Sequence, residues 1–272
     1  MEAPPTLGII AGNGIYPVTM AHAARKAGVG KIAAAAFLNE TDPALAEAVD
    51  ALEWMRVGQL GKLVKFFKQQ AVEQAVMVGQ IAPKNLFDLR PDLRTLMLLG
   101  RLKRRNAETI FGAIGEELAK DGITLISAVT YLDDLLPPPG PVCGPVLKEK
   151  DLADAAYGIS IAKETSRLDI GQTVVVKKGT VLAVEAFEGT NECIRRGGAL
   201  GKGGATAAKV SKPNQDFRFD VPVVGPVTVE VCAGAGVRVL AIEAHRTLLL
   251  DMEEVRRLCA QRGVSIYAVA TA

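Results

Sequence analysis

Short apolar segments alternate with segments of helical periodicity through the first half of the chain. Residues 7–11, 31–37 and 75–79 are almost wholly apolar, which is the pattern of strands buried on both faces of a parallel sheet. Pro17 and Gly28 mark the first turn and the end of a helix between the first two strands. Strands that alternate with helices predict an α/β fold with a Rossmann-like, doubly wound parallel sheet. The other elements of this half are predicted as strands at 54–57 and 123–127 and helices at 43–50, 60–70 and 106–120, the last capped by Asn106.

A proline-rich segment separates this pattern from a different one. Residues 137–145 read PPPGPVCGP, a composition that excludes a helix or a central strand. We therefore predict a first domain at 1–134, a linker at 135–147 and a second domain at 148–272, with a ligand cleft between the domains. The second domain is predicted to be mixed α+β, with helices at 148–168 and 252–262, a hairpin at 173–186 and strands at 207–210, 237–243, 247–250 and 264–269.

Composition narrows the classes of function. The formal net charge is +2 and aromatic residues make up 5%, so neither a basic surface nor a stacking platform for nucleic acid is indicated. The four cysteines lack C-x-x-C spacing and there are two histidines, which argues against zinc and favours oxygen ligands for magnesium or manganese. We find neither a signal peptide nor an uncharged apolar run of membrane-spanning length, so we expect a cytoplasmic protein.

Gly12, Asn13 and Gly14 follow the first predicted strand and precede a helix. At this place an α/β sheet offers backbone N–H groups and a helix N-terminus to a phosphate, and glycine allows close approach of the ligand. The dinucleotide fingerprint G-x-G-x-x-G is broken, because a proline stands at its third glycine. Gly79 and Gln80 end another parallel strand, so we expect them to share one crevice with the first turn. A plain tight turn is the alternative interpretation.

Glu188, Thr190 and Asn191 follow a predicted strand of the second half. They combine a carboxylate, a hydroxyl and an amide that suit a ligand, although such side chains also satisfy the backbone of an ordinary turn. Residues 195–204 then bring two arginines, a lysine and several glycines. We interpret them as a loop that closes over phosphates or, alternatively, as a flexible surface loop. It is not a Walker loop, because the lysine lacks the spacing and the following Ser or Thr.

The densest polar stretch of the chain runs over residues 209–222. Lys209, Lys212 and Arg218 carry charges that neutralise phosphate. Asp216 and Asp220 are separated by an even spacing, which in an extended segment places both on one face. There they would hold a divalent cation or orient a water molecule. A solvated charged loop is the alternative interpretation.

Residues 95–106 read TLMLLGRLKRRN, an apolar segment followed by four positive charges. Such a segment suits contact with an anionic membrane surface. A helix that packs its leucine and methionine face in a core or a dimer interface is the favoured alternative. We accordingly expect a homodimer, with peripheral contact with the inner membrane as a second hypothesis.

Four segments together resemble one family, and the resemblance spans essentially the whole chain. They are LGIIAGNGIYP at 7–17, DIGQTVVV at 169–176, VLAVEAFEGTN at 181–191, and the stretch 209–225. These segments are similar to the UDP-2,3-diacylglucosamine pyrophosphatase of lipid A synthesis, the type that lacks a metallophosphoesterase fold. The family usually has a glycine where this chain has Asn13.

The resemblance implies a two-domain enzyme that acts on a nucleotide-linked lipid and uses Mg²⁺. It implies attack of water at the sugar-side phosphorus, with UMP and 2,3-diacylglucosamine 1-phosphate (lipid X) as products. Carried onto the matching positions, Asp220 is the first candidate for catalysis and metal binding, and Asp216 accompanies it.

Two other classes of function compete with this hypothesis. The first is a Rossmann-type nucleotide-sugar or dinucleotide enzyme such as an oxidoreductase, which the broken glycine fingerprint disfavours. The second is a non-catalytic carrier of lipid or nucleotide. The paired aspartates disfavour it, because a carrier of neutral lipid needs no such carboxylates.

Overall fold

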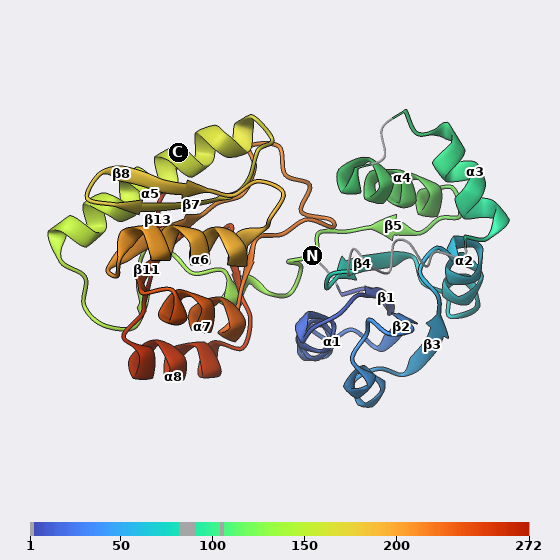
Figure 1. Cartoon of the computed structure of the whole chain (residues 1–272). Helices are drawn as coiled ribbons and strands as arrows, with labels where there is room; N and C mark the ends of the chain where they lie inside the picture. The colour runs from blue at the N-terminus through green and yellow to red at the C-terminus, as the bar shows by residue number, and fades with distance from the viewer. Residues whose placement is uncertain (1–2, 82–90, 104–105, 272) are drawn as a thin grey trace. The chain divides into compact units, whose positions relative to one another are not determined.

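Figure 1 shows the computed structural model, which describes residues 3–81, 91–103 and 106–271. Contacts divide the chain into two compact units. The first comprises Met1–Leu132 and Asp216–Asp220, and the second comprises Asp133–Gln215 and Val221–Ala272. The short segment Asp216–Asp220 therefore packs with the first half of the chain, whereas the sequence analysis assigned it to the second domain.

The first unit is built on a five-stranded parallel sheet in the order β3-β2-β1-β4-β5. Its strands are β1 (Thr6–Ala11), β2 (Lys31–Phe37), β3 (Ala51–Met55), β4 (Gln74–Val78) and β5 (Thr124–Leu125). Its helices are α1 (Tyr16–Lys26), α2 (Leu60–Gln69), α3 (Leu93–Arg101) and α4 (Ala107–Ala119), with a 3₁₀ turn η1 (Pro43–Glu47).

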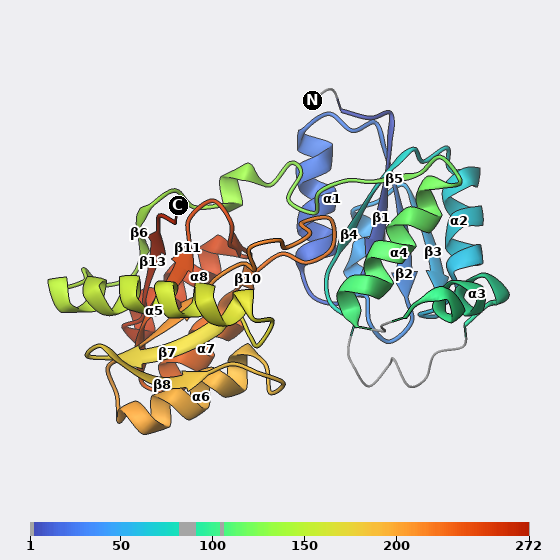
Figure 2. The same cartoon turned by 90° about the horizontal axis from the view of Figure 1, so that it is seen from above.

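Alternate residues of these strands face opposite layers of helices. Ile10, Ala33 and Ala35 share a core with the apolar faces of α2 and α4. On the other face α1 contacts β1, β2 and β4 and buries Met20 and Ala24. Figure 2 shows α1 on one side of the sheet and α2 and α4 on the other. The Rossmann-like, doubly wound arrangement predicted from the sequence is confirmed.

Side-chain caps start two of these helices. Asn106 accepts a hydrogen bond from the Thr109 amide at 2.9 Å, as the sequence predicts. Asp92 caps α3 by accepting from the Thr95 amide at 2.9 Å, and its other carboxylate oxygen accepts from the Gly61 amide at 2.6 Å. Asp92 thus ties the start of α3 to the start of α2.

The edges of the first sheet depart from the prediction. β3 lies at Ala51–Met55 rather than at 54–57, and the strand predicted at 123–127 pairs with β4 only at Thr124 and Leu125. Both are edge strands. Their partly exposed side chains obscure the continuous apolar run that marks a central parallel strand.

The second unit contains a six-stranded mixed sheet in the order β6-β13-β11-β9-β7-β8. The strands β9 (Ala205–Lys209), β11 (Val237–Glu243) and β13 (Ser265–Val269) are parallel, and β6 (Gly140–Cys143), β7 (Thr173–Lys177) and β8 (Thr180–Val184) pair antiparallel. A two-stranded sheet joins β10 (Val223–Val224) to β12 (Leu248–Leu249). The helices are α5 (Glu149–Arg167), α6 (Thr190–Gly201), α7 (Pro226–Gly234) and α8 (Met252–Arg262).

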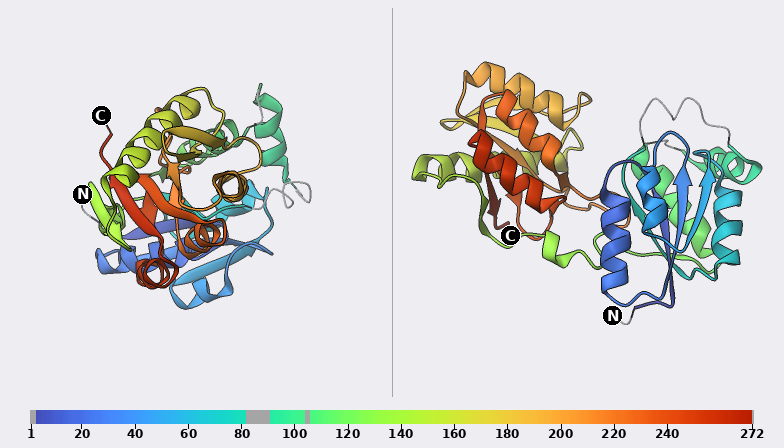
Figure 3. Two further views of the ribbon diagram at one scale, coloured as in Figure 1. Left: turned by 60° about the vertical axis from the view of Figure 1, so that its left-hand side comes forward. Right: turned by 90° about the horizontal axis from the view of Figure 1, so that it is seen from below.

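Helices cover both faces of this sheet as well. α5 packs on one face over Val174, Val176 and Ala208. The helices α6, α7 and α8 lie side by side on the other face, over Val175 and Leu240 (Figure 3). The mixed α+β architecture predicted for the second half is therefore confirmed, although α7 and β10 were not predicted.

The proline-rich segment contributes to the second sheet instead of only linking two domains. β6 lies within it and pairs antiparallel with β13. As an edge strand it tolerates Pro141, whose missing N–H needs no ladder partner on the outer side. The sequence excluded a helix and a central strand here, but the edge strand was not predicted.

Residues 195–204, predicted as a glycine-rich loop, are mostly helical, so that prediction was wrong. They form most of α6, and the glycines have a packing role. A Cβ atom on Gly197 would lie 2.4 Å from Val175 Cβ, and one on Gly198 would lie 2.2 Å from the Ala235 carbonyl oxygen. Glycine therefore lets α6 pack directly against β7 and the end of α7.

A buried carboxylate joins the ends of the parallel strands in the second unit. Glu243, at the end of β11, is 1% exposed. It accepts hydrogen bonds from the Ser211 amide at 2.8 Å, the Ser211 hydroxyl at 2.7 Å, the Lys163 Nζ at 2.9 Å and the Thr271 hydroxyl at 2.7 Å. Burial alone raises the pKa of Glu243, but these hydrogen bonds outweigh it and hold the pKa below its usual range.

Gly197→Ala is expected to lower the free energy of unfolding by about 1–3 kcal/mol, because the added methyl overlaps Val175. The matched control is Gly234→Ala in α7, where a Cβ meets nothing within 4 Å. That variant should match the wild type or gain up to about 1 kcal/mol. Urea unfolding followed by circular dichroism measures both, and equal stabilities of the two variants would contradict the packing role.

Glu243→Gln is expected to lower the free energy of unfolding by about 1–3 kcal/mol at neutral pH, since hydrogen bonds to a charged group are lost. The folded-state pKa is depressed, so this stabilisation is present above the usual glutamate value of about 4.3 and is lost as the pH falls through the lower folded value. The difference in free energy of unfolding between variant and wild type should therefore become smaller as the pH falls. Glu164→Gln, at an exposed pair with Arg167, is the control and should show no such difference.

Candidate functional site

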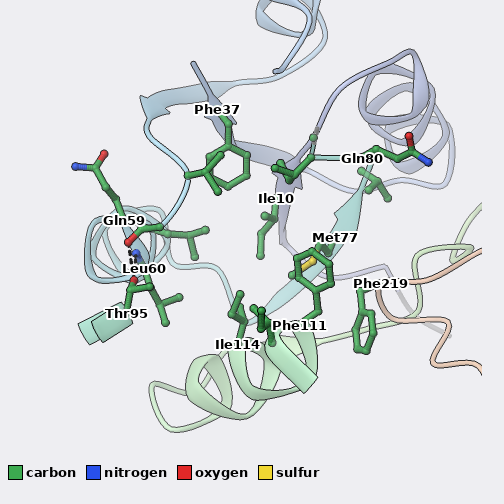
Figure 4. Close-up of a pocket in the computed structure, with 18 of the residues that line it drawn as sticks. Ile10, Phe37, Gln59, Leu60, Met77, Gln80, Thr95, Phe111, Ile114 and Phe219 are labelled. Carbon is green, nitrogen blue, oxygen red and sulfur yellow. Dashed lines mark hydrogen bonds between the residues drawn. The ribbon is translucent and has the colours of Figure 1, made fainter. Parts of the chain in front are cut away.

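A cavity of about 410 Å³ lies in the first unit at the carboxyl ends of β1, β2 and β4. Ligands of open α/β sheets bind at this edge. Helices α2, α3 and α4 form its other walls, and Figure 4 shows side chains from these elements around one common space. Most of the lining is apolar: Ile10, Phe37, Val57, Leu60, Leu63, Met77, Val78, Ile81, Leu98, Leu99, Ile110, Phe111, Ile114 and Phe219.

Gly12 and Gly79 line this cavity and bring the ends of β1 and β4 into direct backbone contact. The Gly12 amide donates to the Val78 carbonyl at 2.8 Å, and the Asn13 amide donates to the Gln80 carbonyl at 2.7 Å. A Cβ on Gly12 would lie 2.6 Å from the Gln80 carbonyl oxygen, and one on Gly79 would lie 2.6 Å from that of Asn13. These glycines are therefore required by the chain itself, independently of any phosphate.

The predicted crevice residues lie together, but their side chains differ in direction. Gly14 has φ +82° and open space around it. The Asn13 side chain donates to Glu40 Oε2 at 3.1 Å. Gln80 lines the cavity, while its side-chain amide points away from the apolar residues (Figure 4). Of this group, Gly12, Gly79 and Gln80 border the cavity.

The segment Asp216–Asp220 closes one side of the cavity. Phe219 packs against Phe111 with 5.8 Å between ring centroids, and the Ala128 amide donates to the Phe217 carbonyl at 2.7 Å. These contacts bring Asp220 to the cavity lining. An aspartate thus belongs to the lining of a mostly apolar chamber.

Asp216 and Asp220 lie in a turn, so the extended strand that would place both on one face is not formed. The Asp220 amide donates to the Asp216 carbonyl at 3.0 Å, which makes the segment a helical turn. Arg218 holds the Asp216 carboxylate through Nε at 2.9 Å and Nη2 at 2.6 Å. This pairing lowers the pKa of Asp216 below its usual range, so the group stays ionised.

The remaining candidates lie in the second unit and have structural partners. Glu188 accepts from the Ala186 amide at 3.0 Å and pairs with Arg196. The Thr190 hydroxyl donates to Glu185 at 3.2 Å, and Asn191 is partly exposed in the first turn of α6. Of these three residues, Glu188 satisfies the backbone of its own turn, as the alternative interpretation expects.

The two predicted lysines also have partners. Lys209 Nζ donates to the Val223 carbonyl at 2.9 Å, and Lys212 Nζ pairs with Asp169. The exposed fraction of the Lys212 side chain is 30%, so this ammonium remains accessible to solvent and to an anion.

Among residues 3–81, 91–103 and 106–271, no cluster of three or more His, Cys, Asp or Glu side chains has the arrangement of a metal site. In the same ranges, no helix combines the length and hydropathy required to cross a bilayer.

The sequence analysis missed the apolar walls of the cavity. Phe111 and Ile114 on α4 and Met77 on β4 were interpreted, if at all, as ordinary core positions. A signal was available: Ile110, Phe111, Ile114 and Leu118 have the helical spacing that gathers large apolar side chains on one face of α4.

Comparisons with known proteins match both units. The family model described as the LpxI N-terminal domain matches residues 6–135, and the LpxI C-terminal domain matches residues 138–267. A curated relative, UDP-2,3-diacylglucosamine pyrophosphatase LpxI of Caulobacter vibrioides, is 31% identical over 274 residues, which is 97% of this chain and 97% of the relative. The two matched domains and this coverage show that the chain belongs to the LpxI family.

Proposed function

We propose that this protein hydrolyses the pyrophosphate bond of UDP-2,3-diacylglucosamine in lipid A synthesis and releases UMP and 2,3-diacylglucosamine 1-phosphate. The relative with 97% coverage carries the name of this activity. The test is direct: the purified protein is incubated with UDP-2,3-diacylglucosamine and Mg²⁺, and UMP is measured. Absence of UMP from folded protein would reject the proposal.

The observation that carries the proposal is a mostly apolar cavity that has the aspartate Asp220 in its lining. A diacylated sugar needs an apolar chamber for hydrocarbon, and the 410 Å³ cavity offers one. Its pyrophosphate needs polar groups at the boundary of that chamber. Asp220 and the backbone around Gly12 and Gly79 border the cavity, at the edge of the sheet where phosphates commonly bind.

Asp220 is proposed to hold and orient the attacking water. The oxygen of this water forms the new bond to the sugar-side phosphorus, and the bond from that phosphorus to the bridging oxygen breaks. The bridging oxygen leaves with UMP. A carboxylate that accepts a hydrogen bond from the water both directs its lone pair and receives the proton.

Arg218 is proposed to contribute positive charge near the reacting phosphates, with Asp216 as its positioning partner. The paired contacts from Nε and Nη2 fix the plane of the guanidinium. Asp216 stays ionised because of that pair, so it does not serve as a proton donor. Lys209 and Lys212 are proposed as further phosphate ligands.

Mg²⁺ is proposed as the cofactor, held by Asp220 together with substrate phosphate oxygens and water. This donor set fits the ion, which commonly binds one or two carboxylates plus phosphates and keeps several waters. It also fits the observed side chains, because Asp216 is engaged by Arg218 and no larger carboxylate cluster occurs in the described ranges. The ion would neutralise charge that develops on the phosphates.

Asp220→Ala is expected to lower turnover by a factor on the order of 100 or more, the scale of a lost general base. The fold should survive, since little apolar volume is removed. Substrate affinity should persist, because the acyl chains keep their cavity. Turnover, affinity and melting temperature are measured beside Glu108→Gln, an exposed carboxylate on α4 that does not line the cavity. A folded Asp220→Ala protein with near-normal turnover would show that the carboxylate only borders the chamber.

Chelation of divalent cations is expected to abolish turnover, and excess Mg²⁺ should restore it. If Asp220 is a ligand, Asp220→Asn should need a higher Mg²⁺ concentration for half-maximal rate than the wild type, since the charge of the ligand is lost. A magnesium titration of initial rates in metal-depleted buffer measures this. Full turnover in excess EDTA would show that the reaction needs no divalent cation.

A further inference from the structure

Helix α3 is apolar on two opposite faces. Leu98 and Leu99 face inward, where they line the cavity of the first unit together with Thr95. Leu93, Leu96 and Met97 face outward, with exposed fractions of 72%, 52% and 51%. Figure 2 shows α3 at the periphery of the first unit, beside α2 and α4. A surface helix normally carries polar residues on its outer face, so this exposed face calls for a partner.

The exposed residues form one continuous stripe. Leu93, Leu96, Met97 and Gly100 follow the i, i+3, i+4, i+7 spacing that places side chains on one side of a helix. We call these four positions the outer stripe. Gly100 is exposed and adds no polar group to it.

Positive charge lies at one end of the outer stripe. Arg101 and Lys103 are exposed at the end of α3, and no acidic residue occurs from Leu93 to Lys103. Arg94 flanks the stripe, but it is already paired with Glu117 and Asp121. An apolar helix face with cationic residues beside it is the pattern of a helix that lies in the interface of an anionic bilayer.

The size of the outer stripe favours a lipid surface over a second copy of this chain. α3 has nine residues, so it is about 14 Å long and about 10 Å wide, which gives a patch of roughly 140 Å². A stable dimer needs about 800 Å² on each partner. A bilayer accepts a small apolar face, because the lipid chains adapt to its shape and anionic headgroups attract the cations.

We propose that the outer stripe of α3, with Arg101 and Lys103, docks the protein on an anionic phospholipid surface. The inner face of the same helix lines the apolar cavity, so docking places that chamber one helix away from the lipid. The docking surface follows from the residues of α3 alone. A role of docking in the delivery of lipid substrate to the cavity rests on the proposed function.

The experiment is sedimentation of the full chain with phosphatidylcholine vesicles that contain or lack phosphatidylglycerol. Leu96→Glu with Met97→Glu should weaken binding to the anionic vesicles at least about tenfold, because apolar contact is replaced by repulsion. Arg101→Gln should weaken it about fivefold. The control is Leu200→Glu with Val227→Glu, which changes two exposed apolar residues of α6 and α7 by the same charge and should leave binding unchanged or within about twofold.

Each outcome decides between occupants. Loss of binding in the α3 variant alone supports the proposal. Equal binding of both double variants, or equal binding to vesicles without phosphatidylglycerol, overturns it. If the wild type ignores vesicles but forms a dimer that the α3 variant disrupts, the outer stripe is a self-association surface and the proposal is wrong. Melting temperatures check that each variant is folded.

Turnover of detergent-dispersed substrate separates this inference from the proposed function. The α3 variant should keep wild-type turnover there, because its substituted residues lie outside the cavity. Vesicle binding without any turnover would reject the proposed function and leave the docking surface standing. Turnover without vesicle binding would reject the docking surface and support the proposed function.

Discussion

Direct contact between two backbones at Gly12 and Gly79 sets the geometry of the first unit. Their Cα atoms leave no room for a side chain, so the carboxyl ends of β1 and β4 are held together by amide-to-carbonyl hydrogen bonds. Both glycines line the cavity, so this main-chain contact fixes part of its wall.

Much of the fold could be predicted because buried helices and strands place apolar residues at regular intervals along the sequence. β2 at Lys31–Phe37 and α8 at Met252–Arg262 were predicted to the residue, since one is buried along its length and the other begins at the Asp251 cap. α6 escaped prediction for the opposite reason. Its glycines read as a loop, and only the position of Val175, distant in sequence, explains why a helix needs them there.

The candidate site was predictable in its polar parts and not in its apolar ones. Gly12, Gly79, Gln80 and Asp220 were recognised from their places beside strands or in a charged segment, and they do border one cavity. Asp216 was expected to act beside Asp220. In the structure its carboxylate accepts hydrogen bonds from Arg218, which is only two residues away. In a sequence, a residue of the cavity wall such as Phe37 has the same pattern as a core residue. The neighbouring sequence does not show whether the space beside an apolar side chain is filled or empty.

The assignment of Asp216–Asp220 to the first unit makes that unit discontinuous along the chain. During synthesis, its strands and helices emerge long before Phe219, which packs on Phe111. All five strands of the sheet, through β5, precede residue 216, so the sheet can form before that segment is made, but the chamber stays without its last wall until residue 220 has left the ribosome. A nascent or truncated first half would thus leave the Phe111 ring without its aromatic partner.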